Sequence, residues 1–152
     1  MIRTVRFLGL LLLATGLLSL TTTLSDPESA EKEVLKLTND FRKSRSKKPF
    51  VLNDSLSLIA RRHSEAMASG RVPFGHKDFK AREKEARKML KSPYASIAEN
   101  VAYGTTSVAE IVEGWKNSPG HRQNMLGNFR LIGIGVAEDK DGQKYYTQLF
   151  VE

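Results

Sequence analysis

The sequence predicts an α+β fold in which helices pack on both faces of a small antiparallel sheet and the chain ends in a β-hairpin. Apolar residues recur at helical spacing in four segments before residue 117, whereas residues 129–151 alternate as strands do. This order excludes a βαβ nucleotide-binding fold, and no glycine-rich phosphate loop is present. The 152 residues, 40% of them hydrophobic and none a cysteine, suffice for one domain without disulfides. A thiolate nucleophile and a cysteine-ligated metal centre are also excluded.

The first 25 residues have the layout of a secretory signal peptide. Arg3 and Arg6 precede an almost unbroken apolar run from Phe7 to Leu20, which is shorter than the roughly 20 apolar residues that a spanning helix needs. Cleavage after Ser25 would leave residues 26–152 as a single domain. The alternative is an uncleaved membrane anchor. In both cases we expect the folded part to be secreted or extracytoplasmic, with the membrane contacted only through this segment.

Two helices are expected in the first part of the mature chain. The first begins at Asp26 and Pro27, because aspartate can accept from the free helix amides and proline fits the first helical position; it ends before Pro49. The second begins near residue 53 or 54 and ends at Gly70. Its apolar face is formed by Leu56, Ile59, Ala60, His63, Ala66 and Met67.

The later elements change from helix to strand. A weaker basic helix is expected at about residues 79–90 and a short strand at 97–103, and Ser107 and Glu110 form a capping box for the next helix. Alternating residues after 129, a turn at 141–142 and a second apolar run at 145–151 form the terminal hairpin. Gly133 and Gly135 remove side chains from one strand face, which indicates that another backbone approaches there.

The formal net charge of +7 is unevenly distributed. Residues 42–91 hold 15 basic and 5 acidic side chains, a net +10, with basic clusters at 42–48 and 77–91. Such a region can attract anionic envelope polymers or phospholipid head groups; nucleic acid shares this chemistry but is not an expected partner of an exported protein. The competing interpretation is a solvated surface, which the interleaved Glu83 and Glu85 favour.

Three histidines and one glutamate are the candidate site residues. His63 lies on the apolar face of the second helix, so we interpret it as a hydrogen-bonded packing residue. His76 and His121 follow helix ends in loops, where a side chain can turn into a cleft. Glu99 is a lone acid in an apolar stretch and needs a partner. Imidazole and carboxylate groups together hold divalent metals such as zinc or transfer protons, so the candidates for a metal site and for catalysis are His76, Glu99 and His121.

Ser118 lies three residues before His121 and raises the alternative of a serine nucleophile, with Glu99 as the third member. Serine directly before Pro119 is, however, an ordinary helix start. No strand-to-helix G-x-S-x-G elbow is present either. We therefore interpret Ser118 as a helix cap.

Five segments, in this order, resemble the bacterial, cysteine-free members of the CAP superfamily of cysteine-rich secretory proteins, antigen 5 and pathogenesis-related proteins. The match covers about residues 30–152 and implies an α-β-α sandwich, an SCP-like extracellular domain. The segments are residues 56–67 with His76 after them, Ala98-Glu99-Asn100-Val101-Ala102, residues 115–124 (WKNSPGHRQN), Ile132-Gly133-Ile134-Gly135-Val136 and residues 145–150 (YYTQLF).

Eukaryotic members of this family carry a cleft tetrad of two histidines and two glutamates that is reported to bind divalent metal. His76 and Glu99 match two of these positions. Ser118 stands at the second glutamate of the W-x-x-E pattern and Tyr145 at the second histidine of H-Y-T-Q, so half of the tetrad is missing. His121, typical of the bacterial S-P-G-H-R pattern, is our hypothesis for a substitute ligand in the same cleft.

The resemblance favours a binding module over an enzyme. In this hypothesis the cleft or the basic face holds a lipid, sterol, cell-envelope polymer or protein partner. The alternative is a metal-dependent hydrolase of peptides or esters, in which His76, Glu99 and His121 hold zinc and an activated water. A third hypothesis is a structural or host-interaction protein in which these polar residues only link the loops.

Overall fold

A computed structural model describes residues 26–93 and 95–152, so the predicted signal peptide lies outside the described residues. The elements run in the order α1 (Pro27–Ser44), β1 (Val51–Leu52), α2 (Asp54–Ala68), α3 (Phe79–Met89), β2 (Ile97–Gly104), α4 (Val108–Asn117), α5 (Pro119–Leu126), β3 (Leu131–Glu138) and β4 (Lys144–Val151). The predicted helices, strand and terminal hairpin are confirmed, most of them within one or two residues of the predicted ends. No helix in this part of the chain is long and apolar enough to cross a membrane.

The strands form one sheet in the order β1-β3-β4-β2. β2 and β3 each pair antiparallel with β4, whereas the two-residue β1 pairs parallel with β3. The sheet is therefore mixed: its antiparallel pairs are as predicted, and the parallel strand β1 was not predicted. β1 was missed because two residues are too few to show an alternating pattern.

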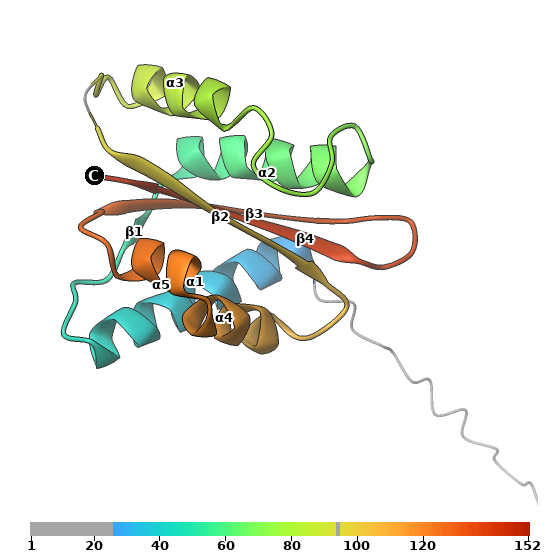
Figure 1. Cartoon of the computed structure of the whole chain (residues 1–152), viewed down its shortest axis with the longest axis horizontal. Helices are drawn as coiled ribbons and strands as arrows, with labels where there is room; N and C mark the ends of the chain where they lie inside the picture. Colours follow the sequence, from blue (N-terminus) through green and yellow to red (C-terminus); the bar gives the residue numbers. More distant parts are fainter. Residues whose placement is uncertain (1–25, 94) are drawn as a thin grey trace, which may run out of the picture.

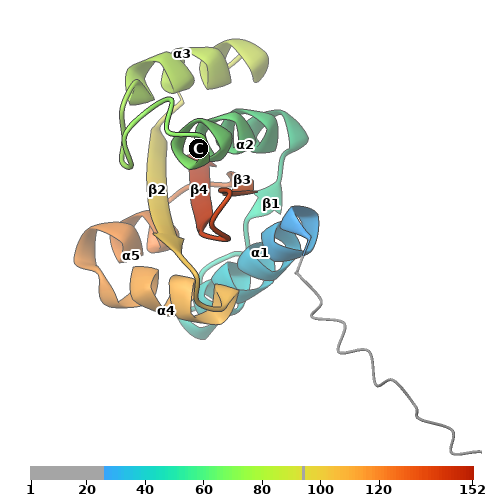
Figure 2. The same ribbon diagram turned by 90° about the vertical axis from the view of Figure 1, so that its right-hand side faces the viewer.

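The helices cover both faces of the sheet. α2 and α3 lie on one face, and α1, α4 and α5 lie on the other (Figure 1, Figure 2), so the architecture is the α-β-α sandwich that the resemblance implied. β2 is an edge strand, and the helices of the two layers pass on either side of it. This position brings side chains from both layers to one strand.

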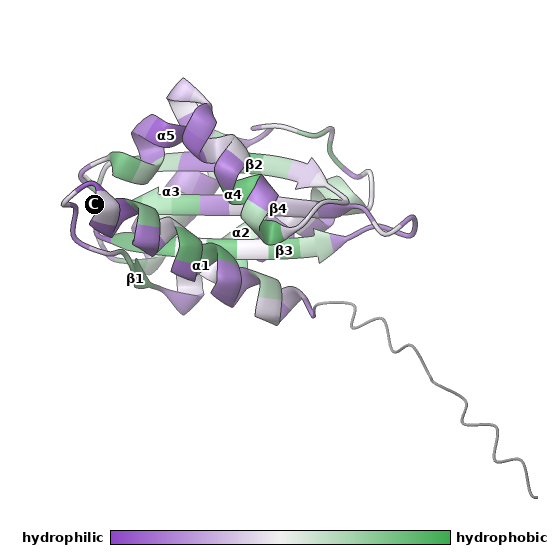
Figure 3. Ribbon diagram, turned by 90° about the horizontal axis from the view of Figure 1, so that it is seen from below, coloured by the Kyte–Doolittle hydropathy of each residue, from purple (hydrophilic) through white to green (hydrophobic). Residues whose placement is uncertain are grey.

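Each face of the sheet has its own hydrophobic cluster. The larger cluster joins α1, α4 and α5 to the sheet around Trp115, Tyr146 and Phe150. Viewed from this side, hydrophobic segments run along β3 and through α1 and α4 (Figure 3). The smaller cluster, around Leu56 and Leu149, lies under α2 and α3.

The glycines of β3 explain how closely α2 approaches. A Cβ added at Gly133 would overlap the backbone of Leu56, and one added at Gly135 would overlap the backbone of Arg61. The close approach predicted from the alternating glycines is therefore confirmed. Because α2 packs closely on β3, and β3 is joined to β2 through β4, the start of the loop after α2 has a defined position relative to β2.

The helix starts are partly as predicted. Ser107 and Glu110 form both bonds of the capping box at α4, and the Asn53 side chain accepts from the Leu56 amide at α2. Asp26 and Ser118 occupy the N-cap positions of α1 and α5, but neither side chain makes a capping hydrogen bond. Ser118 is thus at a helix start, as predicted, without acting as a side-chain cap.

Candidate functional site

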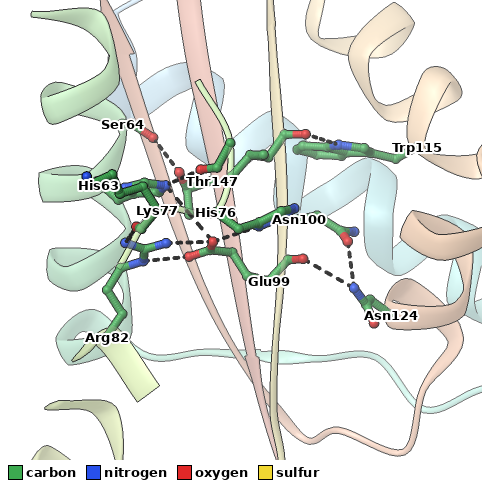
Figure 4. Close-up of polar contacts among 12 residues, drawn as sticks. His63, Ser64, His76, Lys77, Arg82, Glu99, Asn100, Trp115, Asn124 and Thr147 are labelled. Atoms are coloured by element: carbon green, nitrogen blue, oxygen red, sulfur yellow. Dashed lines mark hydrogen bonds and ion pairs between the residues drawn. The ribbon is translucent and has the colours of Figure 1, made fainter. Parts of the chain in front are cut away.

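The site is built around Glu99 on the edge strand β2. Successive side chains of a strand point to opposite faces, so Glu99 points toward α2 and α3 and its neighbour Asn100 toward α4 and α5 (Figure 4). The Glu99 side chain is only 1% exposed. A carboxylate this deeply buried must be compensated by charge and hydrogen bonds.

Arg82 of α3 supplies most of that compensation. Its Nε donates to Glu99 Oε2 at 2.7 Å and its Nη2 to Glu99 Oε1 at 2.7 Å, the two-pronged arrangement that suits guanidinium and carboxylate. A third bond runs from Nη1 to the Lys77 carbonyl at 2.7 Å. Arg82 was not among the predicted site residues, because in the sequence it is one cation among many in a basic segment.

His76 binds the same carboxylate from the loop between α2 and α3. Its Nδ1 lies 2.9 Å from Glu99 Oε1, and its side chain is 52% exposed. The acceptor is a carboxylate, so the ring donates through Nδ1, and Nε2 remains available on the exposed side. Gly75 precedes it with a φ of 132°, a conformation that glycine adopts far more readily than other residues. The predicted pair of His76 and Glu99 is therefore in direct contact.

His63 of α2 holds the loop that carries His76. It is 4% exposed, its Nε2 lies 2.9 Å from the Gly75 carbonyl oxygen, and the same nitrogen lies 4.0 Å from Glu99 Oε1. Burial lowers the pKa of His63, and the positive charge of Arg82 lowers it further. The prediction that His63 is a hydrogen-bonded packing residue is confirmed.

His121 lies in the opposite layer, at the start of α5. Its backbone carbonyl accepts from Asn100 Nδ2 at 3.2 Å, but within the described residues its ring makes no hydrogen bond to His76 or Glu99. Burial lowers the pKa of His121, and the charge of His76 lowers it further. The two imidazoles approach the edge strand from opposite faces, which the separation along the sequence could not reveal.

The described residues do not fit a divalent metal at this site. Among them, no group of three or more His, Asp or Glu side chains is arranged to hold an ion. Both oxygens of Glu99 already accept from Arg82, whose positive charge would repel a cation there. The carboxylate that was predicted as a metal ligand forms one half of a buried ion pair.

Asn100 and Asn124 tie the same strand to α5. Asn100 Nδ2 donates to Gln148 Oε1 at 3.1 Å, and Asn124 Nδ2 donates to Asn100 Oδ1 at 2.9 Å and to the Glu99 carbonyl at 3.2 Å. Trp115 Nε1 donates to the Val101 carbonyl at 3.3 Å. Two outward-facing carbonyls of the edge strand are thus satisfied by side chains, which protects the edge.

Comparison with known proteins is consistent with this architecture. Residues 35–150 match the CAP family, the cysteine-rich secretory protein family. The chain belongs to this family. The CAP domain is 36% identical to the Bacillus subtilis protein YkwD over 137 residues, which cover 86% of this chain and 51% of that protein. It is 31% identical to the B. subtilis membrane protein YlbC over 126 residues, which cover 82% of this chain and 35% of that protein. The chain therefore spans about half of the first relative and a third of the second.

Solved structures share the fold of this CAP domain. An extracellular protein containing an SCP domain from Bacillus anthracis is 25% identical with a TM-score of 0.70, over 83% of this chain and 41% of that one. A cysteine-rich secretory protein from Staphylococcus aureus is 25% identical with a TM-score of 0.68, over 85% and 40%. An outer surface protein from Borrelia burgdorferi, 19% identical, has a TM-score of 0.72 over 84% and 95%, which shows the fold alone.

The CAP domain also carries an aromatic ridge on the Glu99 face of the sheet, formed by Phe74, Tyr103 and the half-buried Tyr145. Phe74 is 47% and Tyr103 is 52% exposed, and their ring centroids lie 4.6 Å apart in an edge-on contact. Tyr103 and Tyr145 are cross-strand partners on the Glu99 face, with centroids 6.0 Å apart. Tyr145, at the position of the family's second histidine, contributes its ring to this ridge.

Proposed function

We propose that this chain is an extracytoplasmic ligand-binding CAP domain whose ligand lies over His76 and the aromatic ridge. The observation that carries the proposal is the half-exposed His76 ring, anchored through Nδ1 to a buried carboxylate. Two exposed aromatic rings accompany it: Phe74 lies two residues before His76 in the same loop, and Tyr103 follows Glu99 on the same face of β2. A rigid polar group next to an apolar surface is the usual composition of a binding site.

The location outside the cytoplasm is supported by two kinds of observation. One solved relative, from B. anthracis, is named as an extracellular protein. In addition, Arg3 and Arg6 precede an apolar run of signal-peptide length. Partners in such a compartment include lipids, sterols, cell-envelope polymers and other proteins.

The chemistry of His76 and the aromatic ridge limits what the ligand presents. Flat aromatic surface binds apolar or flat faces, while His76 Nε2 offers one hydrogen-bonding position. Arg82 and Glu99 neutralise each other and are nearly fully buried, at 11% and 1% side-chain exposure, so they support the site without binding ligand charge. The ligand is therefore expected to combine an apolar face with one hydrogen-bonding group.

Titration followed by amide NMR of residues 74–77 and 103 tests this proposal, with a short-chain phospholipid, a solubilised sterol and soluble cell-wall fragments as probes. We expect one probe to shift these signals. His76→Ala and Tyr103→Ala should each weaken that binding at least about fivefold, the equivalent of about 1 kcal/mol. The matched control is Leu58→Ala, a comparably exposed apolar residue of α2 at 47%. The proposal fails if no probe shifts the cleft, or if the control weakens binding equally.

The metal-dependent hydrolase is the second candidate, and the direct contact between His76 and Glu99 is the observation in its favour. The ion pair between Arg82 and Glu99 weighs against it. Zinc titration of the purified domain and of its His76→Ala variant separates the two candidates. We expect no stoichiometric zinc in either protein; one equivalent that is lost in His76→Ala would favour the hydrolase.

A further inference from the structure

The solvent face of α3 is a stripe of lysines that no acid neutralises. α3 packs through Ala86, which is fully buried, and Lys80, Lys84 and Lys88 follow one another at intervals of four residues on the opposite side of the helix. Lys91 continues the stripe beyond the helix end. All four are exposed, and within the described residues none of them forms an ion pair. In Figure 1, α3 is the outermost helix of its layer.

The acidic residues of α3 do not offset this charge. Glu83 pairs with Arg87 at 3.4 Å, and Glu85 pairs with Arg62 of α2. Both glutamates are therefore held by arginines. In the sequence, their interleaving with lysines favoured a neutralised, solvated surface; in the fold they leave the lysine stripe uncompensated.

A groove at the end of the stripe concentrates the positive charge. It has a volume of about 460 Å³ and is lined by Lys84, Arg87, Lys88, Lys91 and Pro93. No acidic side chain lines it. Arg87 is partly fixed there, because its Nε donates to the Ala95 carbonyl at 3.2 Å in addition to its contact with Glu83. An arginine held in place among exposed lysines suits an anionic ligand.

Helix stability does not explain the stripe. Cations near a helix C-terminus stabilise the helix dipole, which accounts for Arg87 and Lys88. Lys80, however, is the second residue of α3, where a positive charge opposes the dipole, and within the described residues it forms no ion pair with Asp78 at the N-cap. Lys80 at the N-terminus of α3 therefore indicates a role in binding rather than in helix stability.

We infer that the lysine stripe of α3, Lys80, Lys84, Lys88 and Lys91, binds a linear phosphodiester polymer of the cell envelope. Lys80 to Lys88 covers about 12 Å of helix, and Lys91 extends the stripe beyond the helix end, so it can contact several neighbouring phosphates of an extended chain. A membrane surface fits less well: an interfacial helix needs apolar residues along its binding face, and here only Ala81 accompanies the lysines. The exposed Met89 lies on the other side of the helix.

This second binding site is independent of the cleft, and its experiment is independent as well. Binding of long-chain inorganic polyphosphate is measured between 25 and 200 mM salt by fluorescence anisotropy, with phosphatidylglycerol vesicles as the second arm. The test variant changes Lys80, Lys84, Lys88 and Lys91 to Gln. The matched control changes Lys32, Lys36, Lys43 and Lys140 to Gln, which removes the same charge from exposed lysines that already pair with acids.

We expect the test variant to lose at least about tenfold in affinity at low salt. The slope of log affinity against log salt should become about 3 units less steep, because each of the four lost phosphate contacts contributes about 0.7 to that slope. The control should stay within about twofold of the parent protein, since local pairing already screens its lysines. Circular dichroism confirms that both variants fold. The inference is overturned if the parent protein does not bind polyphosphate, if the control loses as much as the test variant, or if vesicles bind more tightly than the polymer.

Discussion

The Glu99 carboxylate is the most constrained group of the molecule. It is buried on an edge strand, and every contact it makes comes from residues 17 to 36 positions away in the sequence. His76 and Arg82 bind the same carboxylate. We therefore expect the position of the His76 ring to depend on the ion pair between Arg82 and Glu99.

Replacing Arg82 tests this dependence. Arg82→Ala leaves a buried carboxylate without its main partner, so the free energy of unfolding should fall by about 3 kcal/mol. Adding Glu99→Gln to Arg82→Ala removes the unpaired charge and should recover part of the loss. Urea denaturation at pH 7.5 gives the free energy of unfolding of Arg82→Ala, of Glu99→Gln and of the double variant. A double variant whose loss equals the sum of the two single losses would show that the pair is not coupled.

The buried His63 makes stability depend on pH. Its folded-state pKa is lowered from 6.5, so as the pH falls below that value the unfolded chain takes up the proton first and stability is lost. The slope is at most about 1.4 kcal/mol per pH unit for one proton. His63→Gln keeps a donor for the Gly75 carbonyl but does not titrate. The unfolding free energy of this variant should therefore change less between pH 7.5 and 5.5; an unchanged difference would exclude His63 as a source.

The residues differ in how far sequence could predict them. His63 was predictable, because a histidine on an apolar helix face must be buried and bonded. The contact of His76 with Glu99 could be proposed but not located, since 23 residues separate them. Arg82 carried no signal: only the fold shows which of the basic residues in α3 turns toward β2. The side of the sheet from which His121 approaches was equally invisible.

At the scale of elements, α2 and β3 make the tightest contact between a helix and the sheet. The glycines of β3 let the α2 backbone approach, and two serines of α2 use that proximity. Ser57 Oγ accepts from the Ile134 amide at 3.1 Å, and Ser64 Oγ donates to the Gly135 carbonyl at 2.9 Å. Small residues on both elements thus replace the side-chain layer that usually separates a helix from a sheet.

Adding one methyl group to this contact should be severely destabilising. In Gly133→Ala the new Cβ meets the Leu56 backbone, which cannot move aside as a side chain could. We expect a loss of about 3 kcal/mol or more in the free energy of unfolding. The matched control is Gly114→Ala in α4, where an added Cβ meets nothing within 4 Å. It should instead gain up to about 1 kcal/mol, because alanine favours the helix.

Thermal and urea unfolding of the two variants give the comparison directly. Similar stability changes in both would mean that the contact between α2 and β3 relaxes at little cost. Most helices and strands were predictable from periodicity, and the alternating glycines of β3 also predicted that another backbone approaches it closely. The exception was β1, whose two residues pair with β3 only because the fold brings the edges together.

Across the whole molecule, the two hydrophobic clusters share one sheet. β3 and β4 contribute alternate residues to each cluster, as Phe150 faces α1 and its neighbours Leu149 and Val151 face α2. If β3 and β4 separate, the apolar side chains of both clusters become exposed to water. The two layers should therefore unfold together, although the polar site and the larger core lie on different faces.

Trp115 provides a probe for this cooperativity, because it is the single tryptophan of the chain and lies in the larger cluster only. Its fluorescence reports the α1, α4 and α5 layer, whereas far-ultraviolet circular dichroism reports all helices and strands. In urea the two transitions should have the same midpoint and the same slope within error. A fluorescence midpoint at lower urea than the circular dichroism midpoint would mean that this layer detaches while α2 and α3 stay on the sheet. The contacts of His76 and Arg82 with Glu99 would then belong to an independently stable half of the domain.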